Sequence, residues 1–195
     1  MIDSSMPLNT LLPIIASSTK SLTATCMMAL ACLIAMAGNP VTASELPMGA
    51  MAEDPEVSEV LVRKEERRLY LLSGEQVVRS YRIGLGDNPS GHKLFEGDER
   101  TPEGEYVLDW RNSNSDFYKS IHISYPNEQD RELASAWGLD PGGSIMIHGL
   151  PNEAGDMAFA FLGLDWTDGC IAVSNEEMDE IWQLVADGTP IRIVP

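Results

Sequence analysis

The chain has 195 residues, of which 44% are hydrophobic and 22% charged, and its formal net charge is −17. This length and composition fit one globular domain with a sizeable core, plus a tail. A surface this acidic argues against nucleic acid and against anionic membrane surfaces as partners.

An apolar stretch occupies residues 22–37. It is short for a membrane span and has the length typical of the apolar region of a signal peptide. Asn39 and Pro40 interrupt it, and the small residues at 41–43 offer a cleavage site. We therefore expect residues 1–43 to be a signal peptide removed on export to the periplasm. An uncleaved inner-membrane anchor is the alternative.

The chain has three cysteines, and Cys26 and Cys32 both lie in this apolar stretch. Cleavage would leave Cys170 as the only thiol of the exported protein. Oxidising compartments favour paired cysteines, so a single one is either buried and inert or retained for chemistry. The cysteine count alone leaves both possibilities open.

The first half of the domain is dominated by strand patterns. Residues 44–56 are predicted to be a flexible acidic linker that precedes a domain at 57–195. A long polar loop at 84–104 contains several glycines, and loops of this length in a compact domain are often functional. The strand patterns lie at 57–64, 67–72, 76–86, 105–110 and 120–126.

The second half alternates short helices with strands. Asn127 is expected to cap a helix at 128–137 that ends at Gly138, and a strand at 144–149 contains His148. Ser174 and Glu177 form a capping box for a helix that packs one face on the sheet. That face comprises Met178, Ile181, Trp182 and Val185, and Gly188 ends the helix; a short helix is expected at 153–164 and strands at 170–173 and 190–195. The fold class is therefore mostly β with a few short helices.

His148 ends one predicted strand and Cys170 begins another, and strand ends present side chains to a cleft. A thiolate attacks carbonyl groups well, and an imidazole can take its proton and later return it to a leaving group. Gly169 allows close backbone approach, and the amides of Gly169 and Cys170 can bind a developing oxyanion. The pair implies acyl transfer through a thioester. A buried Cys170 beside a hydrogen-bonded His148 is the alternative.

The segments "HG" at 148–149 and "TDGCIAVSN" at 167–175, with "GDERTPEGEYVL" upstream, are similar to the signature of the L,D-transpeptidase (YkuD-type) family. The resemblance covers roughly residues 57–195. It implies a β-sandwich catalytic domain with Cys170 as nucleophile, His148 as base, and Gly169 and Thr167 in the motif. It implies no metal and no organic cofactor.

The resemblance also implies a substrate. Members of the family bind peptidoglycan stem peptides; the cysteine attacks the carbonyl of the third residue, and the fourth leaves. An amine from another stem peptide, or from a lipoprotein lysine, then resolves the acyl-enzyme.

Two positions depart from the family signature. Asp168 replaces the usual histidine, and Ala172 replaces a frequent arginine that would recognise a substrate carboxylate. Arg100, Arg111 or Lys93 are candidates to substitute for it. The pattern resembles the YafK-like branch, in which at least some members are thought to hydrolyse, releasing lipoprotein from peptidoglycan, and not to cross-link. The alternatives are therefore a hydrolase that releases peptides or lipoprotein, and an inactive peptidoglycan-binding module.

The remaining predictions concern single residues. Besides Thr167, the candidate substrate contacts are Asp168, Gly149, Arg100 and His92, although a solvated loop position is an alternative for His92. His122 is expected to be structural or at the surface, with a cleft-wall role as the alternative. The four tryptophans are expected in the core or the cleft wall, and the acidic runs at 96–99 and 176–180 on solvated faces. Dispersed histidines lack zinc-ligand spacing, and we expect a monomer.

Overall fold

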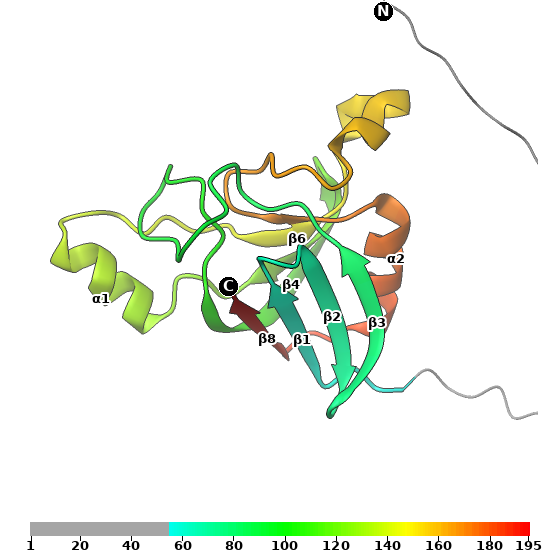
Figure 1. Ribbon diagram of the computed structural model, residues 1–195, viewed down its shortest axis with the longest axis horizontal. Helices are drawn as coiled ribbons and strands as arrows, with labels where there is room; N and C mark the ends of the chain where they lie inside the picture. Colours follow the sequence, from blue (N-terminus) through cyan, green and yellow to red (C-terminus); the bar gives the residue numbers. More distant parts are fainter. Residues whose placement is uncertain (1–54) are drawn as a thin grey trace, which may run out of the picture. The chain divides into compact units, whose positions relative to one another are not determined.

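The computed structural model describes residues 55–195, which form a predominantly β domain (Figure 1). The predicted signal peptide and nearly all of the predicted linker lie outside the described residues. No helix within residues 55–195 is long and apolar enough to span a bilayer. The strands are β1 (Glu59–Arg63), β2 (Arg68–Ser73), β3 (Gln76–Arg82), β4 (Gly104–Ser115), β5 (Tyr118–Ile123), β6 (Met146–His148), β7 (Ile171–Ala172) and β8 (Thr189–Val194). The helices are α1 (Glu128–Ala136), the 3₁₀ element η1 (Asn152–Phe161) and α2 (Asn175–Leu184).

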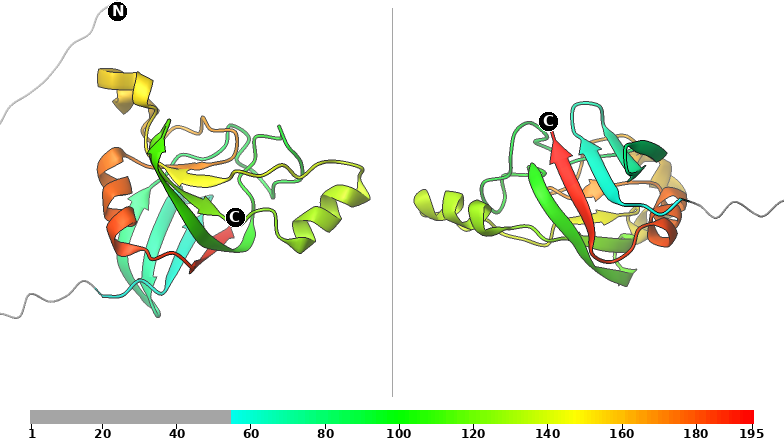
Figure 2. Two further views of the ribbon diagram at one scale, coloured as in Figure 1. Left: turned by 180° about the vertical axis from the view of Figure 1, so that it is seen from behind. Right: turned by 90° about the horizontal axis from the view of Figure 1, so that it is seen from below.

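The strands form one eight-stranded sheet in the order β3-β2-β1-β8-β4-β5-β6-β7. The last strand of the chain, β8, lies in the middle, parallel to β1 and antiparallel to β4. The sheet curls so that its two ends approach each other (Figure 2). An antiparallel bridge between Gly84, just after β3, and Ala172 in β7 joins them.

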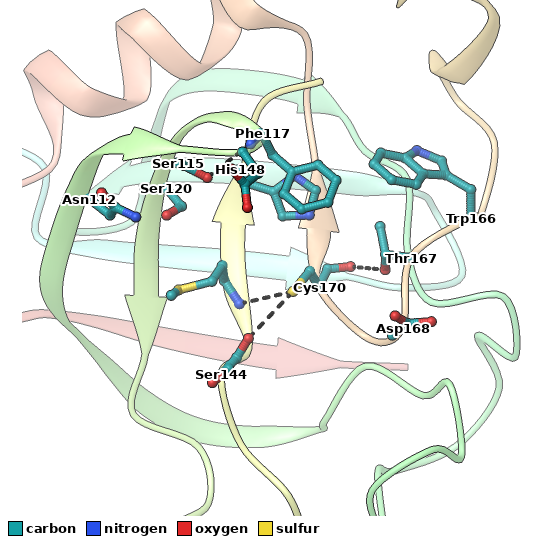
Figure 3. A pocket seen from close by; sticks show the side chains of 12 residues that line it. Asn112, Ser115, Phe117, Ser120, Ser144, His148, Trp166, Thr167, Asp168 and Cys170 are labelled. Carbon is teal, nitrogen blue, oxygen red and sulfur yellow. Dashed lines mark hydrogen bonds between the residues drawn. The ribbon is translucent and has the colours of Figure 1, made fainter. Parts of the chain in front are cut away.

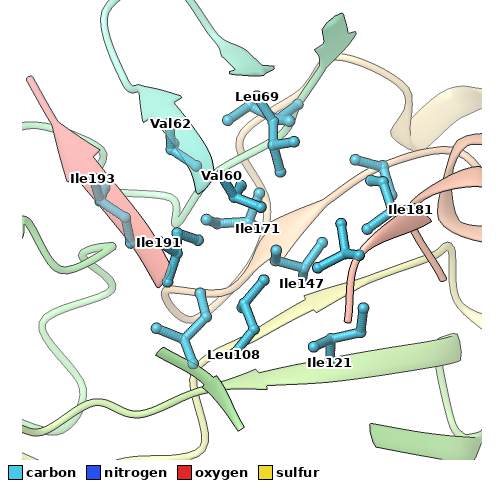
Figure 4. Packing of buried hydrophobic residues seen from close by; sticks show 14 of the residues in the cluster. Val60, Val62, Leu69, Leu108, Ile121, Ile147, Ile171, Ile181, Ile191 and Ile193 are labelled. Atoms are coloured by element: carbon cyan, nitrogen blue, oxygen red, sulfur yellow. The ribbon is translucent and has the colours of Figure 1, made fainter. Parts of the chain in front are cut away.

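The core lies between the two halves of this curled sheet (Figure 4). Val60 and Val62 of β1 and Leu108 of β4 have no exposed surface, and α2 adds Met178 and Ile181 to the same cluster. Burial of apolar side chains at about 25 cal/mol per Å² is the main force holding the curled sheet together. The expected fold class, mostly β with a few short helices, is confirmed.

Both predicted helix starts are confirmed by their capping geometry. The Asn127 side chain accepts a hydrogen bond from Asp130 N, and the Asp130 side chain accepts one from Asn127 N. Ser174 and Glu177 do the same at the start of α2. Each capping box satisfies two amide donors that a helix N-terminus otherwise leaves unpaired.

Several element boundaries differ from the prediction; β3, for example, ends at Arg82 and β5 at Ile123, short of the expected ends at 86 and 126. The helix expected at 153–164 is a 3₁₀ element that breaks at Gly155, where φ is +48°. The strand expected at 170–173 pairs only at Ile171–Ala172, because Cys170 belongs to the preceding turn. Strand β4 is longer than expected and extends to Ser115.

Two of the tryptophan predictions are wrong. Trp137 is 74% exposed at the C-terminus of α1, and Trp110 is 44% exposed on β4. Trp182 packs against the core and Trp166 lines a pocket, as expected. The acidic run at 96–99 is only partly solvated, since Asp98 is buried against Lys93.

Candidate active site

Cys170 ends a turn that depends on Thr167. The Thr167 hydroxyl donates to Cys170 O at 2.7 Å and accepts from Gly169 N at 3.2 Å. Gly169 has φ +127°, and a Cβ atom there would lie 2.5 Å from Arg100 O. Only glycine fits this position, because a side chain would be strained and would clash with backbone. Thr167 thus shapes the turn in addition to lining the pocket beside Cys170.

The sulfur of Cys170 lies against the backbone next to β6. Met146 N donates to Sγ at 3.4 Å, and the thiol donates to Ser144 O at 3.6 Å. Burial raises the pKa of the thiol, with a smaller rise from Asp168; the Met146 amide and the charge of Lys93 oppose this. The resting group is therefore a thiol at neutral pH. Among the described residues, the amide N–H of Cys170 has no protein acceptor.

His148 ends β6, and its partner in the neighbouring parallel strand β7 is Ala172. Nδ1 lies 2.7 Å from Gly149 O. A carbonyl can only accept, so Nδ1 carries the proton and Nε2 has a free lone pair. Burial lowers the pKa of His148 to about 4, so the ring is neutral at pH 7. Phe117 and Trp166 lie against the ring, with centroids at 4.7 and 5.7 Å.

Gly149 positions His148, and it is not among the residues that line the pocket. Its N–H points to Phe117 O and Lys119 O at 3.1 and 3.2 Å. A Cβ atom there would lie 2.6 Å from Asn175 Oδ1, the atom that accepts a hydrogen bond from Leu150 N. The segment after β6 is therefore packed too closely for a larger residue.

Cys170 and His148 line one pocket of about 300 Å³ (Figure 3). No hydrogen bond among the described residues joins the two side chains directly. The tip of the β4–β5 hairpin supplies one wall of the pocket, which the sequence did not reveal. The expected contacts Thr167 and Asp168 also line it; the remaining lining residues are Asn112, Ser115, Asp116, Phe117, Ser120, Ser144, Met146 and Trp166.

The pocket is acidic. Asp116 and Asp168 line it, and no lysine or arginine is among its lining residues. Of the cations proposed from sequence to bind a carboxylate, Arg111 contacts Asp187 and the end of α2 instead. Lys93 is buried against Asp98. The pocket thus lacks the carboxylate-binding cation that a residue at 172 often supplies in the family signature.

His92 and Arg100 lie in the loop at 84–104, and neither lines the Cys170 pocket. His92 accepts from Glu103 N at 3.1 Å, and its Nε2 lies 3.2 Å from the buried carboxylate of Asp130. The Arg100 guanidinium reaches back to His92 O at 3.4 Å. Their side chains therefore hold the loop together, whereas Arg100 meets the site through its backbone at Gly169.

A buried lysine fastens the same loop to β1. Lys64 Nζ donates to Gly91 O, Thr101 O and Glu103 Oε1 at 2.6, 2.9 and 2.8 Å. Burial lowers the pKa of Lys64, although Glu103 acts against this.

Within residues 55–195, His, Cys, Asp and Glu side chains form no group of three able to hold a metal ion.

This geometry can be compared with known proteins. The family model of the L,D-transpeptidase catalytic domain (YkuD) matches residues 58–193. The chain belongs to this family. YafK of Escherichia coli strain K12, which carries an L,D-transpeptidase name, is 36% identical over 133 residues. That match covers 65% of this chain and 46% of YafK, so the chain spans about half the length of that relative.

A second sequence relative and a solved structure are also similar to this chain. YqjB of Bacillus subtilis strain 168, also named as an L,D-transpeptidase, is 25% identical over 154 residues, covering 75% of this chain and 78% of YqjB. Among solved structures, Pgp2 of Campylobacter jejuni, described as a helical cell shape determining protein, has a TM-score of 0.55 and 28% identity. That similarity covers 72% of this chain and 48% of Pgp2. The family assignment therefore rests on a family model, on relatives in sequence and on a solved structure.

Proposed function

We propose that the protein is a cysteine acyltransferase that acts on peptidoglycan stem peptides in the periplasm. The observation that carries this proposal is the pocket shared by Cys170 and His148, with Nε2 of His148 available as a base. No cofactor enters the proposed reaction. The protein is proposed to act as a monomer, and the acyl acceptor is an amine of a second stem peptide or of a lipoprotein lysine.

The first half-reaction forms a thioester. As Sγ of Cys170 attacks the substrate carbonyl carbon, its proton passes to Nε2 of His148, and the carbonyl oxygen takes up the electron pair. The free N–H of Cys170 is the donor best placed for that oxyanion, since Gly169 N is already bonded to Thr167. The C–N bond then breaks, and the imidazolium returns the proton to the leaving amine.

The second half-reaction reverses these roles. An incoming amine gives a proton to Nε2 while its nitrogen bonds to the thioester carbon. The C–S bond then breaks, and the proton returns to the sulfur. Because the resting pair is a thiol and a neutral imidazole, proton transfer accompanies attack, and no ion pair is formed beforehand. The distance between such groups is often long without substrate and shortens when substrate binds.

The pocket charge supports a substrate with a free amine. Asp116 and Asp168 provide carboxylates in the pocket. The family resemblance implies that the attacked stem-peptide residue is a diamino acid, and the side-chain amine of such a residue is cationic. Carboxylates beside that amine would hold it by charge-assisted hydrogen bonds. The substrate carboxylate has no matching cation among the lining residues.

Hydrolysis is the second candidate. Its supporting observation is Asp168, whose carboxylate lines the pocket beside the nucleophile and can hold a water near the thioester. Water would then replace the amine in the second half-reaction, and the product would be a free tripeptide stem. An inactive peptidoglycan-binding module is the remaining alternative.

The experiment separates these outcomes. Purified protein is incubated with stem tetrapeptide and a D-amino acid, and products are identified by mass spectrometry. Exchange at the fourth position indicates a transpeptidase, whereas free tripeptide without exchange indicates a hydrolase. A carbapenem, which presents a strained electrophilic carbonyl, should acylate the wild type but not Cys170→Ala. Absence of turnover together with absence of the adduct would show that the module is inactive.

A further inference from the structure

A second cluster of polar and aromatic side chains lies outside the pocket, on β4 and β5. The imidazole of His122 stacks on the indole of Trp110, with centroids 4.8 Å apart and planes at 15°. Nδ1 of His122 lies 2.6 Å from Asp109 Oδ1. One face of the indole is therefore occupied, yet Trp110 remains 44% exposed. We call Asp109, Trp110 and His122 the platform.

The platform sits at an irregularity of the sheet. The pairing of β4 with β5 shifts register between Leu108 and Arg111, and Asp109 and Trp110 are both exposed there. In a regular strand, neighbouring residues point to opposite faces, so a bulge is needed to expose two in succession. Leu108 beside them is fully buried. The bulge thus brings a carboxylate and an indole to the surface together.

The platform and the Cys170 pocket share one face of the sheet. Asn112 pairs with Ser120, and Ser120 with His148; all three line the pocket (Figure 3). One step further along the strands, His122 pairs with Met146, whose N–H lies 3.4 Å from Cys170 Sγ. The platform therefore lies on the same face of the sheet as the pocket, directly beside the residues that contact Cys170.

The separation can be estimated from sheet geometry. Trp110 is on β4 and Met146 is on β6, with β5 between them. Neighbouring strands are about 4.8 Å apart, so Trp110 lies roughly 10 Å from Met146, the residue whose N–H contacts the reacting sulfur. An extended peptide advances about 3.3 Å per residue, so this span corresponds to about three residues. A ligand group joined to the reacting carbonyl by a short peptide can reach it.

We infer that the platform binds an N-acetylhexosamine ring of the glycan strand to which the stem peptide is attached. This inference rests on the proposed function. An exposed indole offers a flat apolar surface to the C–H face of a pyranose, and nearby polar groups can pair with its hydroxyl and acetamido groups. Nε2 of His122 and the carboxylate of Asp109 provide such groups, because Nδ1 of His122 is already engaged with Asp109.

A purely structural role and a nucleic-acid-binding role both fit the platform less well. A structural tryptophan would be buried, and an indole 44% exposed contributes little to the core. Nucleic-acid bases also stack on tryptophan, but the net charge of −17 opposes a phosphate backbone. A neutral, hydroxyl-rich ring agrees with both the aromatic surface and the acidic charge.

The test compares two substrates that differ only in the sugar. One is the free stem tetrapeptide, and the other is the same tetrapeptide attached to its disaccharide. Trp110→Ala should raise KM for the disaccharide substrate about tenfold, the size of one lost stacking contact, and leave kcat and the free tetrapeptide unchanged. Trp110→Phe should restore part of the affinity. Trp137→Ala, which removes an exposed tryptophan from α1, is the matched control and should change neither substrate.

An equal rise in KM for both substrates would show that Trp110 contacts the peptide or shapes the pocket, and would overturn the inference. Unchanged KM for the disaccharide substrate would also overturn it. If the wild type turns over neither substrate, the proposed function fails, and calorimetric titration with an N-acetylglucosamine tetramer decides the platform separately. Binding that Trp110→Ala abolishes and Trp137→Ala preserves supports it; binding unaffected by Trp110→Ala, or no binding to the wild type, overturns it.

Discussion

The turn that carries Cys170 and the loop at 84–104 are both polar and both depend on glycine, but their polar groups are used in opposite ways. At the loop, Lys64 at the end of β1 donates to three acceptors of the loop, and Lys93 pairs with Asp98. Beside the turn, the N–H of Cys170 and Nε2 of His148 have no partner within residues 55–195 and lie next to a pocket. Polar groups that satisfy one another build structure, whereas those left available next to a cavity can act on a ligand.

The largest expected effect comes from removing the proposed nucleophile, Cys170. Cys170→Ala should lower kcat by about 10³-fold or more, because no other group can form the thioester. The melting temperature should change little, since Cys170 remains partly exposed at the pocket. Turnover of stem tetrapeptide and thermal melts measure both quantities. Retained activity, or a large loss of stability with a thiol that resists alkylation, would identify Cys170 as a core residue.

At the loop, a substitution should lower stability, whereas Cys170→Ala in the turn should lower activity. Lys64→Met removes the donor that holds two carbonyls and Glu103, so the free energy of unfolding should fall by about 3 to 5 kcal/mol. Chemical denaturation measures this loss. Arg63→Met is the matched control, because Arg63 forms an exposed pair with Glu66 and its removal should cost less than about 1 kcal/mol. Equal losses of unfolding free energy in the two variants would show that the hydrogen bonds of Lys64 stabilise the domain no more than an exposed ion pair does.

His148 should make the stability of the folded domain depend on pH. Its pKa falls from 6.5 to about 4 on folding, so between these values the unfolded state binds more protons and stability falls as the pH falls. The loss should reach about 3 kcal/mol between pH 7 and 4. The lowered pKa of Asp98 acts in the same direction but below its ordinary value of 3.8.

Denaturation at a series of pH values tests this assignment. His148→Gln should lose most of the slope between pH 6.5 and 4, whereas His122→Gln should keep it. A slope that persists in His148→Gln would assign the titration to another group.

The smallest effect is expected at the helix that follows the turn. Ser174→Ala removes the side chain that accepts from Glu177 N, and it should lower the free energy of unfolding by about 1 kcal/mol. Ser174→Asp should retain most of that stability, because a carboxylate also caps a helix N-terminus. Denaturant titration of the three proteins measures the difference. Equal losses in both variants would show that packing of the hydroxyl, and not capping, is responsible.

Much of this fold followed from local patterns. The capping boxes at Asn127 and Ser174 depend on residues three positions apart, and the strand patterns depend on alternation, so both were predictable. The family signature singled out Cys170 and His148, and the structure places them in one pocket.

The remaining features depend on long-range register. His92 was a candidate substrate contact, but its partner Asp130 lies on a distant helix that no local pattern connects to it. The hairpin tip with Phe117 reaches the pocket only because β4 extends beyond its predicted end. The exposed Trp110 depends on a bulge, which sequence alternation did not indicate.

The central position of β8 has a consequence for how the domain forms during synthesis. Strand β8 joins β1 to β4, so in any portion of the chain that ends before Thr189, β1–β3 and β4–β7 can pair only through the isolated bridges that follow β3. Pairing between such distant segments is slow and comes late in folding. During synthesis, the Cys170 thiol is therefore present before the folded sheet and pocket that would direct its reactivity. A growing or clipped chain that ends between Cys170 and Thr189 therefore carries the proposed nucleophile without the complete sheet.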